Sequence, residues 1–460
     1  MTDLDENLTT TGDGDDLPDF MNMTEEELLA RAEPQITGDS PDGTHVWARV
    51  PHTAELYGDV TDWATDIDHA SPDYNHQAPE IWKDLREGGC PVAHSERYGG
   101  MWAPITHDTV QEVAYDTETF TSRSVVVSHM RPGDLSLPAP IGGAPPITSD
   151  PPFHNMARRI LLPPFAPKVI AEWEDEVRAL CRRLLDDMGE IEPGETVVDA
   201  AVQYAQHIPV SVIRRMLGFP ERDEALFRQF VHDVIEKVNA PPEERRLGFL
   251  RLDAYLETQV QDHIENPRDD LTSYLLDVEL DGNKLAPEHV RGSIVLLLIA
   301  GIDTTWSAIG SSLWHLAQTP GDRKRLVEDP EVMTFALEEF LRSYAPVTMA
   351  RLVAQDHDFH GCPMKKDDWV LLPFPAANRD PKQFEDADRF IIDREVNRHS
   401  AFGLGIHRCL GSNLARLELK VAIEEFIGRF PDFELAGETT WSVGQIRGPR
   451  KLPVRINATA

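Results

Sequence analysis

The chain has 460 residues, of which 79 are Asp or Glu and 44 are Lys or Arg, so its formal net charge is −35. A chain of this length can bury one large core or two ordinary ones. The strong negative charge argues against nucleic acid as a partner, because binding to phosphates requires a basic face.

The N-terminal residues 1–45 are rich in Asp, Glu, Gly and Thr and poor in apolar side chains, which predicts an acidic, flexible arm. They lack the basic segment followed by an apolar segment that is typical of a secretory signal. The most apolar run, "SIVLLLIAGI" at 293–302, is far shorter than the roughly 20 residues that span a bilayer. We therefore expect a cytoplasmic protein without membrane segments, with its globular domain at 46–460.

Helical periodicity dominates the chain from about residue 75 onward. In the segment 168–188, apolar side chains recur every three or four residues, and Cys181 lies on this apolar stripe, which predicts a core thiol. Similar patterns predict helices at 222–238, 246–265, 287–317, 330–343 and 410–429. Short β-like runs lie at 357–364 and 368–374. The expected fold is mainly α with minor β.

The predicted helix at 287–317 contains an unusual polar interruption. Its apolar stretch "LLLIAGIDTTWSAIG" is broken by Gly301, Asp303 and Thr304. Glycine costs about 1 kcal/mol in a helix interior, and Asp and Thr compete for backbone hydrogen bonds. Such a run predicts either a kink at a helix crossing or a local opening that serves a function.

The next predicted helix carries the segment "EEFLR", in which Glu339 and Arg342 lie three residues apart and share one face. An exposed ion pair of this kind contributes only ~0–1 kcal/mol to stability. Because apolar side chains alternate around the pair, partial burial is the other possibility.

The segment "AFGLGIHRCL" at 401–410 places Cys409 behind two glycines and a histidine. Gly403 and Gly405 disfavour a helix before the cysteine, and a helical pattern starts after it. The N–H groups at such a helix start favour a thiolate. One cysteine without companions is a poor zinc site, whereas it suits iron that four porphyrin nitrogens already hold. A buried structural cysteine remains the alternative.

Together these motifs resemble the cytochrome P-450 superfamily, in its bacterial soluble class. The haem-binding signature Phe-x-x-Gly-x-x-x-Cys-x-Gly is matched in full by Phe402, Gly405, Cys409 and Gly411. "AGIDTT" matches the oxygen-activating motif of the family, and "EEFLR" matches its Glu-x-x-Arg motif. The motifs occur in the expected order, and the resemblance runs from about residue 75 to the C-terminus. It implies a single large triangular helical domain with small β-sheets.

The resemblance also implies a haem site. It assigns haem b (iron protoporphyrin IX) as the cofactor, Cys409 as the iron ligand, and Asp303 and Thr304 as an acid–alcohol pair that delivers protons during the activation of O2. The implied cofactor-binding residues are His154, Arg158, Ala300, Gly301, Arg351, Phe402, Gly405, His407, Cys409 and Gly411. The implied structural network beside the haem loop is Glu339, Arg342 and Arg389.

The implied activity is that of a haem-thiolate monooxygenase, which inserts one oxygen atom of O2 into a small to medium apolar organic substrate. The reaction is hydroxylation, with epoxidation or O-dealkylation as variants. By family analogy the pocket wall is apolar and comprises Val125, Val127, Leu298, Val347, Met349 and Ile446. The alternative is a thiolate-haem sensor or electron-transfer protein, which would not need Asp303 and Thr304.

Electrons must come from another protein under this hypothesis. The chain carries no dinucleotide-binding glycine motif, flavin domain or cysteine cluster for iron–sulfur, so a separate ferredoxin and ferredoxin reductase are expected. The candidate docking cations near the haem loop are Arg398, Arg408, Arg416 and Lys420.

Overall fold

The computed structural model describes residues 23–24, 26–28, 48–49, 58–89, 91–127, 130–131, 144–236, 242–280, 282–442 and 444–457. The predicted acidic arm at 1–45 lies almost entirely outside these residues, so its flexibility stays a prediction.

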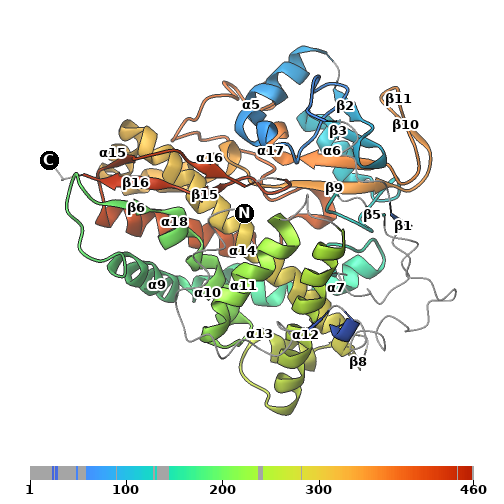
Figure 1. Ribbon diagram of the computed structural model, residues 1–460, viewed down its shortest axis with the longest axis horizontal. Coiled ribbons are helices and arrows are strands. Elements are labelled where there is room, and N and C mark those ends of the chain that lie inside the picture. Colours follow the sequence, from blue (N-terminus) through green and yellow to red (C-terminus); the bar gives the residue numbers. More distant parts are fainter. Residues whose placement is uncertain are drawn as a thin grey trace.

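Helices form most of the described chain. They are α5 (Pro72–Glu87), α6 (His107–Tyr115), α7 (Phe153–Leu161), α8 (Pro167–Ala171), α9 (Glu174–Asp186), α10 (His207–Met216), α11 (Glu224–Val231), α12 (Pro242–Glu265), α13 (Leu271–Asp277), α14 (Pro287–Gln318), α15 (Pro320–Glu328), α16 (Met333–Ser343), α17 (Phe374–Ala377) and α18 (Ser412–Arg429). The outline in Figure 1 is roughly triangular, with one corner formed by α12 and α13.

The predicted helices occur in the structure, but several bounds differ. The helix predicted from 246 begins at Pro242, and the one predicted from 330 is a 3-10 turn at Pro330–Val332 followed by α16. The segment 168–188 divides into α8 and α9, and α9 begins with Glu174, Asp175 and Glu176. Three acidic side chains in a first turn complement the positive end of the helix, which favours a start at this place. The segment 222–238 is α11 followed by a π-helical turn at His232–Glu236.

The β-structure is confined to small sheets. The largest has the order β2-β3-β12-β9-β4, in which β12 runs parallel to β3 and antiparallel to β9. Its strands are β2 (Val92–Ser95), β3 (Met101–Pro104), β4 (Phe120–Thr121), β9 (Thr348–Val353) and β12 (Trp369–Pro373). The other strands that the site uses are β6 (Val197–Asp199), β13 (Phe433–Leu435), β14 (Thr440–Trp441), β15 (Pro449–Lys451) and β16 (Pro453–Ile456). The β-like run at 368–374 is confirmed as β12, and the run at 357–364 forms the hairpin of β10 (His357–Phe359) and β11 (Cys362–Met364).

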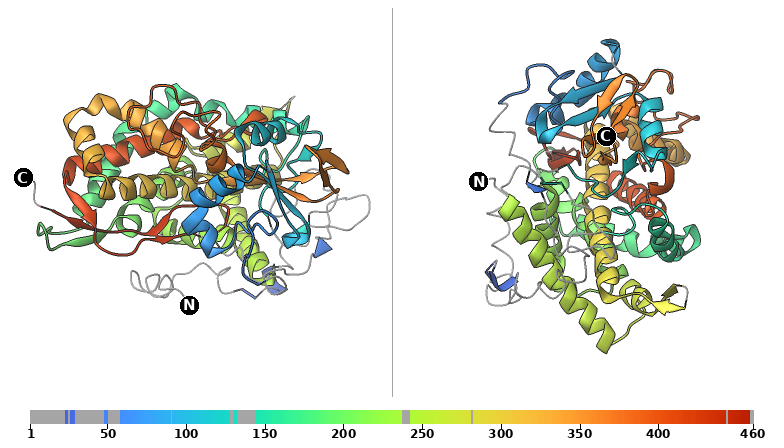
Figure 2. Two further views of the ribbon diagram at one scale, coloured as in Figure 1. Left: turned by 90° about the horizontal axis from the view of Figure 1, so that it is seen from above. Right: turned by 90° about the vertical axis from the view of Figure 1, so that its right-hand side faces the viewer.

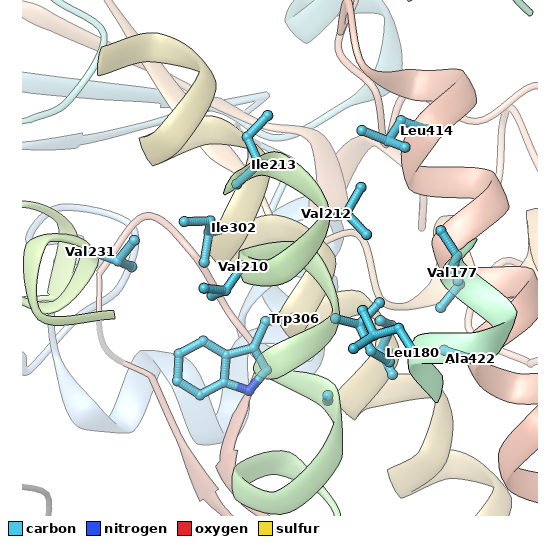
Figure 3. Packing of buried hydrophobic residues seen from close by; sticks show 14 of the residues in the cluster. Val177, Leu180, Val210, Val212, Ile213, Val231, Ile302, Trp306, Leu414 and Ala422 are labelled. Atoms are coloured by element: carbon cyan, nitrogen blue, oxygen red, sulfur yellow. The ribbon is translucent and has the colours of Figure 1, made fainter. Parts of the chain in front are cut away.

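The central element of the core is α14, which crosses the molecule lengthwise in the right-hand view of Figure 2. Its Ile302 and Trp306 lie beside Val210 of α10 (Figure 3). Among the described helices, α14 alone is long and apolar enough to cross a membrane, but 61% of its most apolar window is buried inside the protein. This burial is the property of a central core helix. Cys181 of α9 is fully buried, which confirms the predicted core thiol.

A buried ion-pair network ties the segment before Cys409 to α16. Glu339 and Arg342 are both 0% exposed, so theirs is not a surface pair. Arg342 Nε and Nη2 each donate to the Glu339 carboxylate at 2.8 Å. Arg394 completes the network, because its Nε donates to Glu339 Oε2 at 3.0 Å. A carboxylate that accepts from two guanidinium groups can stay ionised in the interior.

The prediction that Arg389 is the third member of this network is wrong. Its guanidinium is exposed and pairs with Asp386 at 3.0 Å. Only its backbone takes part, because its carbonyl oxygen accepts from Arg342 Nη2 at 2.8 Å. Arg389 and Arg394 lie five residues apart in an irregular segment, and periodicity cannot rank the two in such a segment. The bend of the chain turns the Arg394 side chain inward.

The same network fixes the start of the cysteine loop. Glu339 also accepts from the N–H of Ile391 at 2.8 Å and from Asn397 Nδ2 at 3.0 Å. Asn378 then accepts from the N–H and the hydroxyl of Ser400 at 2.7 and 2.8 Å. The irregular stretch that leads to residue 401 is therefore anchored at several points to rigid elements.

We predict that Arg394→Gln lowers the free energy of unfolding by about 3–5 kcal/mol, because it leaves a buried carboxylate with one cation fewer. The matched change Arg389→Gln removes the same charge from an exposed side chain and should cost less than about 0.5 kcal/mol. Denaturant unfolding of both variants measures the difference. Equal losses would contradict the assignment of Arg394 to the network.

Candidate active site

The loop 401–411 takes its shape from left-handed glycines. Gly403 and Gly405 have φ of 71° and 67°. A Cβ on Gly405 would lie 2.5 Å from the carbonyl oxygen of Ala114, at the end of α6. Gly405 therefore lets the loop pass against α6, and its implied place among the cofactor-binding residues stays a prediction. Gly411 differs, because a Cβ there would meet no protein atom within 4 Å, which leaves space for a ligand.

Cys409 lies near the end of this loop, three residues before α18 begins. Its N–H donates to the carbonyl oxygen of Phe402 at 2.7 Å. The side chain is exposed although it lies deep in the protein. It therefore faces an internal space. Burial raises the pKa of this thiol, and the N–H of Gly411 and the charge of Arg158 lower it by less. The N–H of Gly411 at the helix start thus favours the thiolate, as predicted, but burial outweighs it, and a bound metal ion would stabilise the ionised sulfur.

A multi-ligand metal site does not compete with this assignment. Within the described ranges, no group of three or more His, Cys, Asp or Glu side chains could hold a metal ion. A single sulfur ligand therefore requires a metal whose other positions are already filled, which is the situation of haem iron.

The middle of α14 carries an exposed face inside the core. Ala300 is exposed and Thr304, one turn later, is partly exposed, whereas Asp303 is buried. Thr304 Oγ1 donates to the carbonyl oxygen of Ala300 at 2.8 Å. The helix continues from Pro287 to Gln318, so the polar run does not end it, and the predicted kink or local opening stays a prediction. The polar residues give the helix one small, accessible patch with a hydroxyl group.

The carboxylate of Asp303 is bound on another face of α14. It accepts from the guanidinium of Arg450, which lies on β15, and from Ser307 Oγ at 3.5 Å. Nothing in the sequence pattern connects position 450 with position 303, so Arg450 escaped the sequence analysis. The predicted acid–alcohol pair is thus adjacent in the chain, but its two side chains differ in burial.

The predicted propionate ligands His154 and His407 lie together. Their ring centroids are 4.4 Å apart, and His407 Nε2 is 2.9 Å from Ser122 Oγ. Burial lowers the pKa of both rings, that of His407 to about 2. Both are therefore neutral at neutral pH. His154 Nε2 is buried and has no hydrogen-bond partner among the described residues, a cost that a bound acceptor would remove.

Arg351 lies in the same region as a buried cation. It is 3% exposed, and its Nη1 donates to the carbonyl oxygen of Ala350 at 2.7 Å. Burial lowers its pKa to about 10, so it stays charged at neutral pH. No carboxylate of the described residues lies within ion-pair distance of it, and Asp150 acts only at longer range. A buried charge of this kind requires an anion, and a haem propionate would supply one.

Arg158 on α7 lies at the border of this site. Its Nη2 donates to the carbonyl oxygen of Arg408 at 2.5 Å. Together with Cys409 and Arg416 these residues line a concavity of about 520 Å³. Arg416 is partly engaged, because it pairs with Glu338 at 2.6 Å and covers the Phe402 ring at 4.5 Å. The concavity is therefore cationic in a strongly acidic protein.

The predicted pocket wall comes together in part. Val347 and Ile446 form an isolated antiparallel bridge. The neighbouring Gln445, which the sequence analysis missed, is buried and links two distant backbone segments by hydrogen bonds. Its Nε2 donates to the carbonyl oxygens of Val125 and Thr348 at 3.1 and 2.8 Å. A buried amide joins backbone groups from distant segments only after folding, so no local pattern indicates it.

Two predicted pocket residues are core residues instead. Val127 is 2% exposed and packs with the cluster between α5 and the main sheet, and Leu298 is 3% exposed within the main core. Neither has surface left to line a pocket. Val347, Met349 and Ile446 are partly exposed and remain candidates, whereas Val125 is nearly buried.

The buried acid Glu418 is a further residue that the sequence analysis missed. It lies on α18, two turns after Cys409, and is hydrogen-bonded to Thr305 of α14. Burial raises its pKa to about 8, so it is mostly protonated at neutral pH. The sequence signal was an acidic residue flanked by Leu417 and Leu419 within an apolar helix face.

These features define a haem-thiolate site: a lone cysteine exposed to an internal space, an accessible alanine–threonine face on the central helix, and buried cationic and imidazole groups suited to two carboxylates. The family model for cytochrome P450 matches residues 195–441. A cytochrome P450 from Bacillus subtilis (strain 168) is 36% identical over 296 residues, covering 64% of this chain and 71% of the relative. The polyketide biosynthesis cytochrome P450 PksS of the same organism is 31% identical, covering 68% and 77%.

A solved structure agrees with the sequence comparisons. That of CYP109E1 from Bacillus megaterium in complex with testosterone has a TM-score of 0.76 at 28% identity, covering 84% of this chain and 100% of that chain. The chain belongs to the cytochrome P450 family. It is a P450 monooxygenase with the P450 fold, and it carries haem whose iron is bound by a cysteine thiolate. These findings confirm the fold, the cofactor and the enzyme class that the motifs predicted.

We predict that Arg351→Gln has opposite effects without and with haem. Without haem it should leave stability unchanged or raise it, because it removes a buried charge that lacks an anion. With haem it should weaken binding by about 10–100-fold, the value of one charged hydrogen bond. Haem transfer to apomyoglobin and thermal unfolding of both forms measure these effects. Arg455→Gln, on β16, where Arg455 pairs with Glu434 at 3.1 Å, is the control, and equal behaviour of the two variants would contradict the site.

Proposed function

We propose that this monooxygenase inserts one oxygen atom of O2 into a small to medium apolar organic substrate, chiefly by hydroxylation. Its electrons would come from a separate ferredoxin and ferredoxin reductase, in the cytoplasm. The observation that carries the proposal is the accessible face of Ala300 and Thr304 within an otherwise apolar helix. It offers a substrate one hydroxyl group and little other polarity.

The substrate class is supported by the groups that surround this face. The partly exposed apolar side chains here are Val347, Met349 and Ile446. Their segments are joined by the Val347–Ile446 bridge and by the hydrogen bond from Gln445 to Thr348. An apolar wall with few polar groups suits an apolar ligand. The relatives fit this size range, since one is named for polyketide biosynthesis and another was solved with testosterone. Epoxidation and O-dealkylation remain variants of the same proposal.

Haem, when bound, supplies the activation of O2, and the residues of this chain supply position and protons. Cys409 would bind the iron, and Arg351, His154, His407 and Arg158 would hold the propionates. Thr304 Oγ1 can turn from the Ala300 carbonyl oxygen and hold a proton at the exposed face of α14. Asp303 is the adjacent acid that would return a proton to it.

We predict that Thr304→Ala uncouples oxygen consumption from product formation, because the exposed face loses the group that holds the proton. Loss of one positioned proton donor typically costs about 10²–10⁴-fold. The control is Ser312→Ala, since Ser312 Oγ makes the same kind of bond to the Ala308 carbonyl oxygen on the same helix, at 2.8 Å. Product, oxygen and hydrogen peroxide are measured with a substrate found by spin-state screening. Unchanged coupling in Thr304→Ala would overturn the proton role of Thr304.

The electron donor is proposed to bind at the cationic concavity beside Cys409. The concavity is lined by Arg158, Arg408 and Arg416, against a net charge of −35 for the chain. A local positive patch in an acidic protein steers an acidic partner to one place. The concavity also leads directly to Cys409, because the cysteine forms part of its lining.

We predict that Arg408→Glu slows electron transfer from an acidic [2Fe–2S] ferredoxin by about 10-fold or more at low salt, with the difference fading at high salt. The control is Arg429→Glu, at the other end of α18, which pairs with Asp186 at 3.1 Å. Stopped-flow reduction over a salt series measures the effect. If both variants respond equally, the ferredoxin binds elsewhere on the protein. The proposed docking site then fails, whereas the proposed oxygenase activity stands.

A further inference from the structure

We propose that Arg450 is a positioning residue for proton delivery. It holds the Asp303 carboxylate against β15, so Asp303 can pass a proton to Thr304 only when this ion pair opens. The inference rests on the proposed role of Asp303 in the oxygenase reaction, and it adds a residue from the C-terminal part of the chain to that role.

The contacts of Arg450 converge on a single turn of α14. Its Nη2 donates to Asp303 Oδ1, and its Nη1 donates to Ser307 Oγ at 3.0 Å. The guanidinium carbon lies 4.2 Å from the centroid of the Trp306 ring. The side chains of Arg450 and Asp303 are 6% and 1% exposed. A planar guanidinium that is hydrogen-bonded on two nitrogens and stacked on an indole has one orientation.

The packing of β15 on α14 is built to bring Arg450 to this place. A Cβ on Gly448 would lie 2.3 Å from Ser307 Cβ, so only glycine lets the strand approach. On the helix side, a Cβ on Gly310 would lie 3.3 Å from Pro449 Cδ. The two glycines thus let the strand lie close to α14 one to two turns after Asp303. Figure 1 shows β15 beside α14.

The consequence of this arrangement is electrostatic. A buried carboxylate is stable in its ionised form only if a cation compensates it, and Arg450 supplies that cation. While the pair is closed, Asp303 is held ionised and is directed away from the exposed face of Thr304. Delivery of a proton then requires the pair to open and Asp303 to gain a proton. Arg450 therefore sets how often the acid is available.

The other buried acid near this turn faces a different element. Glu418 is hydrogen-bonded to Thr305, which lies two residues from Asp303 and so points to the opposite side of the helix. Arg450 thus acts on Asp303 and not on Glu418. Substitution of Arg450 tests the Asp303 route separately.

The first experiment compares Arg450→Gln with Lys451→Gln in the ferric holoenzyme. Both changes remove one positive charge from β15, but Lys451 is exposed. Isotope-edited infrared difference spectra should show a protonated-carboxyl band in Arg450→Gln, which the added change Asp303→Asn removes. The band should be absent in the parent and in Lys451→Gln. Its absence from Arg450→Gln would overturn the inference. If that variant does not fold, Arg450→Lys takes its place. It loses part of the guanidinium contact, so it should show a protonated-carboxyl band that Lys451→Gln lacks, and no such band would overturn the inference.

The second experiment measures the solvent isotope effect on product formation. We expect it to fall toward unity in Arg450→Gln, because proton delivery no longer waits for the pair to open, and to stay unchanged in Lys451→Gln. If Asp303→Asn leaves coupling and the isotope effect as in the parent, the proposed function of Asp303 fails. If Asp303→Asn impairs both but Arg450→Gln behaves as Lys451→Gln does, only the inference about Arg450 fails.

Discussion

The buried carboxylate of Glu339 is the interaction on which the rest of the site depends. It accepts from Arg342, Arg394, Asn397 and the N–H of Ile391. Each of these groups would be costly to bury alone, and the set satisfies them together. Most of these partners lie in the irregular chain before residue 401. The network therefore holds this segment, which lacks secondary structure, in one position ahead of the Cys409 loop. Cys409 thus owes its position to a carboxylate that it does not contact.

Charge has different effects at different scales in this protein. The net charge of −35 describes the solvated surface. The site, in contrast, buries Arg351 without an anion within ion-pair distance among the described residues and collects Arg158, Arg408 and Arg416 around Cys409. Interactions inside the low-dielectric interior are screened little by the surface charges. An acidic protein can therefore bind an anionic cofactor at one place.

The central helix separates several kinds of environment around its circumference. Ala300 and Thr304 are accessible, Asp303 is held by Arg450, and Thr305 meets the protonated acid Glu418. Successive side chains on a helix point about 100° apart, so neighbours in sequence reach different elements. This explains how a motif of six residues brings together an accessible face, an ion-paired acid and a contact to a second buried acid on one helix.

The sequence alone determined the helical class of the fold, the polar interruption of α14 and the Glu339–Arg342 pair, and it singled out Cys409 as the candidate iron ligand. These are local features, carried by periodicity, spacing and residue type within one segment. The tertiary structure decided whatever depends on a partner from elsewhere. It replaced Arg389 by Arg394, assigned Gly405 to packing against α6, placed Val127 and Leu298 in the core, and brought Gln445 and Arg450 to the site. Such contacts join residues as far apart as Gln445 and Val125, which are separated by 320 positions. Only the folded backbone sets which side chain turns inward, since no local propensity encodes that choice.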